Sequence, residues 1–114
     1  MSLDKVGDVA RELGQLEQAR SAYQESLDIG RQLLQRTGDA PQSLRDLSVS
    51  LSNVGNVAWE LGQMEQARSA YQEALAIVQR LQRVLSSDRS LETAERNLRL
   101  ALQQLDMHLP DPSA

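Results

Sequence analysis

The sequence predicts an all-α fold in which antiparallel helical hairpins stack side by side. The first observation is composition: leucine, alanine and glutamine dominate, phenylalanine is absent and β-branched residues are few, a bias that favours helices over strands. The second is that residues 2–29 recur with few changes as residues 50–77, and such a fixed period, about 48 residues, indicates repeated structural units. The third is the helical spacing of apolar residues within each copy. We therefore expect five helices in two and a half units.

The first unit, residues 2–36, is predicted to be one hairpin. Its first helix carries apolar and small residues on one face: Leu3, Val6, Gly7, Ala10 and Leu13. Gly14 follows, where a helix commonly ends in a left-handed residue, and a second helical pattern runs from Leu16 to Leu34. Small residues and one tyrosine are predicted to meet across the hairpin: Gly7, Ala10, Ala19, Ala22 and Tyr23.

The second unit, residues 42–85, repeats this arrangement. The equivalent interior residues are Gly55, Ala58, Ala67, Ala70 and Tyr71. The segment "TGDAP" separates the units, and we expect Asp39 to cap the next helix and Pro41 to occupy its first turn. After "SSDRS" a fifth helix is predicted over residues 88–108, as a half unit that covers the last hairpin.

Both units carry an apolar-Gly pair followed by an Ala-x3-Tyr motif: Val6-Gly7 with Ala19 to Tyr23, and Val54-Gly55 with Ala67 to Tyr71. This pattern resembles the tetratricopeptide repeat family, in a long-helix variant with a period near 48 rather than the usual 34 residues. The closing proline of the family is missing at Arg31 and Gln79. The resemblance implies a short right-handed solenoid that binds proteins and is not an enzyme. We expect one domain over residues 1–109 and a disordered tail over residues 110–114.

The first helices of the two units differ mainly on the face opposite the predicted core. Either this solvated face has drifted, or it lines the concave groove that binds a ligand in the resembled family. Under the second interpretation the groove residues are Asp4, Asp8, Arg11, Glu12, Val49, Ser52, Asn53, Asn56, Trp59, Glu60, Arg99 and Gln103, followed by Asp106. Trp59 either anchors a ligand, as exposed aromatic residues often do, or packs on an adjacent helix.

This predicted groove is polar and mildly acidic. Glu12 and Glu60 stand where some family members carry a lysine that clamps a C-terminal carboxylate, so a carboxylate ligand would meet like charge. We therefore expect a neutral or basic peptide or helix as partner. The alternative is a structural spacer or self-association segment of a larger regulatory protein, with no groove ligand.

Several function classes are disfavoured by composition. The net charge is -4 and basic residues are scattered, which argues against nucleic acid as a partner. No apolar run reaches the length of a membrane span, and no signal peptide is evident. The chain lacks cysteine and has one histidine, His108, so we expect no catalytic site, no metal and no cofactor, and a cytoplasmic location.

Two and a half units fall short of the roughly three that a stable array needs. Three explanations are open: the chain belongs to a longer array, its long helices suffice, or two copies associate. We favour self-association as a homodimer, by end-to-end stacking or by exchange of hairpins.

Overall fold

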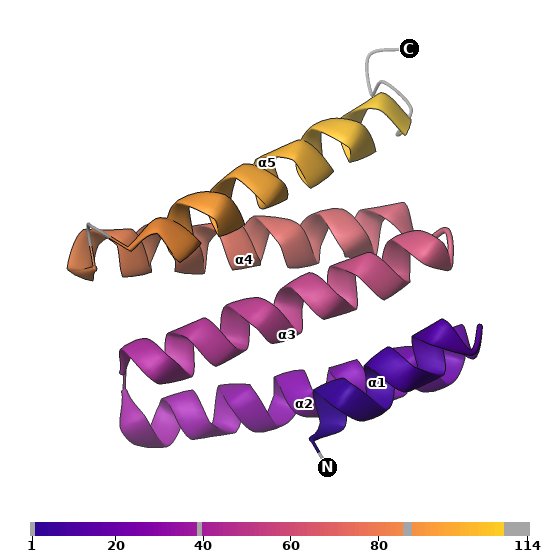
Figure 1. The fold of residues 1–114 in the computed structure, drawn as a ribbon, viewed down its shortest axis with the longest axis horizontal. Helices are drawn as coiled ribbons and strands as arrows, with labels where there is room; N and C mark the ends of the chain where they lie inside the picture. The colour runs from indigo at the N-terminus through magenta and orange to yellow at the C-terminus, as the bar shows by residue number, and fades with distance from the viewer. Residues whose placement is uncertain (1, 39, 86–87, 109–114) are drawn as a thin grey trace.

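The computed structural model describes residues 2–38, 40–85 and 88–108, and within them it contains helices and no strands (Figure 1). The five helices are α1 (Leu3–Glu12), α2 (Leu16–Thr37), α3 (Pro41–Glu60), α4 (Met64–Val84) and α5 (Arg89–His108). Each helix packs against the next along the chain. The all-α stack of two hairpins and a fifth helix is thus confirmed. The tail predicted at residues 110–114 lies outside the described residues.

Each hairpin turns at a glycine in the left-handed region. Gly14 has φ 76° and Gly62 has φ 78°, a conformation that costs glycine nothing because it has no Cβ. In the first turn the Gln15 amide donates to the Ala10 carbonyl at 2.8 Å, which satisfies one of the last carbonyls of α1. The predicted turns are therefore correct in position and in cause.

The interior of each hairpin is built around one close approach between a glycine and a tyrosine ring. A Cβ on Gly7 would lie 2.5 Å from Tyr23 Cε1, and a Cβ on Gly55 would lie 2.7 Å from Tyr71 Cε1. Both tyrosines are buried. Only glycine leaves room for the ring. The Gly and Tyr are therefore the same in both copies because the same packing contact occurs in both hairpins.

The main core lies between α3, α4 and α5, and α3 is the central helix of the molecule (Figure 1). Besides Tyr71, it consists mainly of leucine and β-branched side chains: Leu27, Leu44, Leu47, Leu51, Ile77, Val78, Leu81, Leu91, Leu98 and Leu105. A second, smaller cluster joins the two hairpins through Val57, which packs together with Ala10, Ala19 and Tyr23. Burial of these side chains supplies the main driving force for the stack.

The outer side of α1 departs from the sequence prediction. Val6 and Leu13 were expected on the core face, yet both are exposed. The reason is visible at the equivalent positions Val9 and Val57. Val57 is 0% exposed because it packs on the first hairpin, whereas Val9 is 48% exposed because none of the described helices packs on that side of α1. Gly7 and Ala10, which face α2, are buried as expected.

The helix starts differ in how they are capped. Ala40 holds the N-cap position of α3 and offers no side-chain hydrogen bond, while Pro41 occupies the first turn as predicted. Asp39, the expected cap, lies outside the described residues. At α5 the Asp88 carboxylate accepts hydrogen bonds from the Ser90 hydroxyl at 2.6 Å and amide at 2.9 Å, and it pairs with Arg45 of α3. The Ser90 donors and the guanidinium lower the pKa of Asp88 to about 2.

One residue distinguishes α5 from the first helix of each hairpin, α1 and α3. Leu102 occupies the position that corresponds to Gly55 when α5 is aligned with α3. Leu102 is half-buried and packs against the main core. Because a single Cβ at the Gly55 position already approaches a tyrosine ring to 2.7 Å, α5 has no equivalent seat for a tyrosine from a further helix.

Candidate partner-binding groove

The face formed by the first helices contains a cavity of about 290 Å³ between α3 and α5. Both helices pack on α4, and Figure 1 shows α3 and α5 sloping in the same general direction, with α4 between them in this view. The floor and walls are apolar (Tyr71, Val78, Ala94, Leu98 and Ala101), and the remaining lining residues are Ser48, Val49, Ser52, Asn53, Asn56 and Asn97. We call this cavity the α3–α5 groove. Apart from the Tyr71 phenol, no lining side chain is ionisable, so the groove suits an uncharged ligand group.

The side chain of Asn56 is held in one orientation by Tyr71, which lies in the floor of the groove. The buried Tyr71 hydroxyl donates a hydrogen bond to Asn56 Oδ1, which leaves the amide NH₂ of Asn56 as a donor for another group. Burial raises the pKa of Tyr71 to about 12, so the hydroxyl keeps its proton at any physiological pH. The groove therefore carries a fixed hydrogen-bond donor beside an apolar floor.

The equivalent position in the first unit has the same internal contact but the opposite external character. The Tyr23 hydroxyl donates to Asp8 Oδ1, and burial together with this carboxylate raises the pKa of Tyr23. The position thus varies between Asp and Asn because the fold requires only an acceptor oxygen. Both residues were expected to be displayed on the surface, whereas each also serves the interior. The signal was available, since each acceptor stands 15 residues before its tyrosine.

A second concavity, of about 420 Å³, lies between α1 and α3 and is lined by Asp8, Arg11, Glu12 and Glu60. The Arg11 guanidinium of α1 pairs with the Glu60 carboxylate of α3, and this hydrogen bond raises the pKa of Arg11. The Arg11–Glu60 ion pair therefore has no net charge, while the side chains of Asp8 and Glu12 make this concavity acidic. Asp4 is half-buried, and its Oδ1 has no hydrogen-bond partner among the described residues.

Trp59 lies partly buried beside the groove floor. Its ring meets the Tyr71 ring edge to face, with centroids 6.4 Å apart and planes at 76°, and it packs against the main core. This geometry matches the interpretation in which Trp59 packs on an adjacent helix. Tyr71 lines the α3–α5 groove and Trp59 does not. Trp59 therefore contacts the groove lining without itself forming part of it.

The predicted site residues thus fall into separate places. Val49, Ser52, Asn53 and Asn56 come together in the α3–α5 groove. Arg99 and Gln103 instead line a different concavity on α5, beside Glu95, and Asp106 pairs with Arg68 of α4 at 2.7 Å.

The α5 side of the groove was not predicted from the sequence; it consists of Ala94, Asn97, Leu98 and Ala101. Positions of α3 were transferred directly to α5, but the two helices line opposite sides of this groove, so α5 contributes the face that it turns toward α3. These four residues follow the spacing i, i+3, i+4, i+7, and that spacing was the available signal.

The opposite face, formed by α2 and α4, also holds a cavity, of about 350 Å³. Its rim is charged, and Arg31 of α2 pairs with Glu73 of α4 across it at 2.7 Å. Such exposed pairs contribute little stability and remain hydrated. We therefore take the α3–α5 groove, with its uncharged polar rim and apolar floor, as the stronger candidate.

Two negative findings apply to the described part of the chain. No helix there is both long and apolar enough to cross a membrane. No group of three or more His, Asp or Glu side chains in residues 2–38, 40–85 and 88–108 is placed to hold a metal ion.

Comparison with known proteins gives one match. A family model described as "Tetratricopeptide repeat" matches residues 1–40 and 47–81. No curated protein and no solved structure matches the chain.

Proposed function

Because the chain belongs to the tetratricopeptide repeat family, whose repeats generally mediate protein–protein interaction and are non-catalytic, we propose that it binds a peptide or helix of a partner protein in the α3–α5 groove. The observation that carries this proposal is the combination of an apolar floor with three asparagine amides, Asn53, Asn56 and Asn97. An amide both donates and accepts, as a peptide backbone does. An apolar partner side chain would bind the floor while the amides bind its backbone.

The charge of this face supports a neutral or basic partner. The α3–α5 groove is uncharged, and the concavity beside α1 adds Asp8 and Glu12. A C-terminal carboxylate that extended toward α1 would meet these acids, at an electrostatic cost that selects against it. The absence of cysteine fits a cytoplasmic location, which stays a prediction.

A peptide library displayed on phage and selected on the immobilised chain tests the proposal. Selected peptides should bind with affinity that Asn53→Ala weakens about tenfold, the effect of one lost hydrogen bond at a desolvated site. Asn53 is preferable to Asn56, because Asn56 also accepts from the buried Tyr71 hydroxyl and its removal would perturb folding. Gln72→Ala, at an exposed position of α4, is the matched control and should leave binding unchanged. Peptides whose binding ignores Asn53→Ala would rule the groove out.

A second candidate function is self-association, and one observation favours it. The outer side of α1 exposes apolar residues at Val6, Val9 and Leu13, although the equivalent Val57 of α3 is buried against a neighbouring hairpin. Light scattering at several concentrations distinguishes the candidates. A dimer that Val9→Ser dissociates would favour the structural role, and a monomer at all concentrations would exclude it.

A further inference from the structure

The outer side of α2 is covered along only part of its length. α1 spans 10 residues, whereas its counterpart α3 spans 20 residues. Figure 1 shows α1 lying over one half of α2 and leaving the half that leads to α3 uncovered. In the second unit the equivalent half of α4 is covered by the first half of α3. The two units therefore provide an internal comparison of one surface with and without its neighbour.

Two apolar residues of α2 register the difference. Ile29 is 51% exposed and its equivalent Ile77 is 9% exposed; Leu33 is 44% exposed and its equivalent Leu81 is 0% exposed. Ile29 and Leu33 stand four residues apart and so share one helical face. Both hairpins pack on a following helix, α2 on α3 and α4 on α5, so the following helix does not account for the contrast. Among the described residues, nothing equivalent to the first half of α3 lies over this half of α2.

The second unit shows what this surface packs against. Ile77 and Leu81 belong to the same core cluster as Leu44 and Leu47, which stand at i and i+3 in the first half of α3. We propose that Ile29 and Leu33 form a docking site for an amphipathic helix of a partner protein, one that carries leucines at this spacing and lies antiparallel to α2. The site is continuous with the α1–α2 interface, so a bound helix would extend the line of α1 beyond Leu3.

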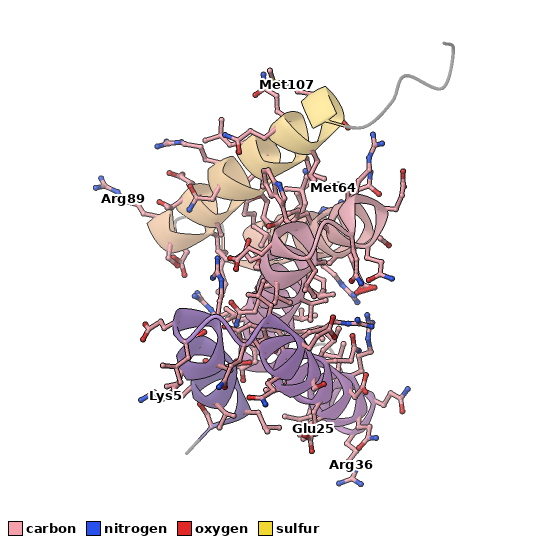
Figure 2. The ribbon with its side chains drawn as sticks, turned by 90° about the vertical axis from the view of Figure 1, so that its right-hand side faces the viewer. Lys5, Glu25, Arg36, Met64, Arg89 and Met107 are labelled. Carbon is pink, nitrogen blue, oxygen red and sulfur yellow. The ribbon has the colours of Figure 1, made fainter. Side chains whose placement is uncertain are left out.

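Charge adds a second requirement on the partner. Arg36 lies exposed in the last turn of α2, and Figure 2 shows it at the end of the stack farthest from α5. A helix antiparallel to α2 would place its first turn beside Arg36. Acidic residues are favoured there by the helix dipole and also by the guanidinium. The equivalent residue of α4 is the uncharged Val84, so this preference is particular to the first unit.

The probe is a fluorescent peptide with the sequence of residues 40–52, "APQSLRDLSVSLS", titrated with the full chain and followed by anisotropy. Leu33→Ser should weaken binding about tenfold, the effect of losing one half-buried leucine contact. Val84→Ser, at an apolar position 66% exposed on α4, is the matched control and should change nothing. A peptide with Gln42→Glu should bind more tightly at low salt, and only while Arg36 is present.

A tethered version decides the case if the free peptide is too weak a helix. A copy of residues 40–49 is fused to the amino side of Ser2 and replaces Met1, so that α1 is lengthened as α3 is. This extended chain should melt at least about 5 °C higher, and Leu33→Ser should cancel most of the rise while Val84→Ser cancels none.

Four results would overturn the proposal. In the first, the peptide does not bind and the extension does not raise the melting temperature. In the second, Val84→Ser weakens binding as strongly as Leu33→Ser does. In the third, Asn53→Ala weakens binding of the peptide, which would place the peptide in the α3–α5 groove. The fourth is a dimer of the chain that Leu33→Ser dissociates while the peptide fails to bind, which would assign the patch to a second copy. The groove proposal stands or falls separately, because its test uses Asn53.

Discussion

Replacing Gly55 by alanine tests the packing that defines each hairpin. The added Cβ would lie 2.7 Å from Tyr71 Cε1, 2.9 Å from Cδ1 and 3.0 Å from Cζ. The ring has little freedom to withdraw, because its hydroxyl donates to Asn56 and it forms an edge-to-face pair with the ring of Trp59. The methyl group must therefore displace a fixed aromatic ring or push α3 away from α4.

Two opposing effects set the magnitude. Alanine improves helix propensity by about 1 kcal/mol over glycine. Overpacking a filled interior costs about 1–3 kcal/mol, and contact with three atoms of a held ring places this site at the upper end. The net loss is about 2 kcal/mol, which corresponds to a fall in melting temperature of about 8 °C for a chain of this length.

Circular dichroism melting of two variants measures it. Gly30→Ala is the matched control, because its Cβ would lie 3.6 Å from Leu47 Cδ1, an ordinary contact; this variant should gain up to about 1 kcal/mol from propensity alone. In a Tyr71→Leu background the cost of Gly55→Ala should largely disappear. If Gly55→Ala stabilises the chain as much as Gly30→Ala does, the close approach of glycine and ring is not the reason for the glycine.

Three further outcomes are expected. Val57→Ala should destabilise the chain by about 2 kcal/mol, because Val57 is fully buried between the hairpins, whereas Val9→Ala should change stability by less than about 0.5 kcal/mol; urea unfolding of the pair measures both, and equal losses would contradict the assignment. The Tyr71 phenol, with an ordinary pKa of 10.0 and a folded value of about 12, contributes stability that is complete below pH 10 and is lost as pH rises toward 12; tyrosinate absorbance that appears near pH 10 while the helices persist would refute this. Asp8→Asn should lower the pKa of Tyr23 by removing the carboxylate that favours the neutral phenol, and an unchanged titration would show that burial alone sets it.

The repeat made most of the fold readable from the sequence. Gly7 and Tyr23 recur as Gly55 and Tyr71, and a pair kept in two copies of one element marks interior packing. Helical spacing gave the elements, and the left-handed glycines gave the turns. The exposure of Val6 could not be predicted from the repeat. Equivalent residues of the two units can differ in burial, because burial depends on which helices pack beside them.

The candidate site was less accessible to sequence reasoning. Positions that differ between units were taken as displayed, yet Asp8 and Asn56 differ only within the limits set by a hydrogen-bond acceptor for tyrosine. Arg99 was assigned by transferring an α3 position to α5, but the α5 side of the groove is the face that α5 turns toward α3, where Ala94 and Asn97 lie. The helical spacing of the α5 lining residues shows that they share a face, but a single segment does not show which helix lies opposite that face.

Leu102 gives this array a direction in which it can lengthen. Tandem repeats grow when a hairpin is copied in register, and each new tyrosine needs a glycine opposite it. A copy inserted between α2 and α3, or between α4 and α5, would bring its own glycine and tyrosine together. A helix added after α5 would instead present its tyrosine to a branched leucine. Lengthened relatives of this chain should therefore carry their extra hairpins before the helix that bears this leucine.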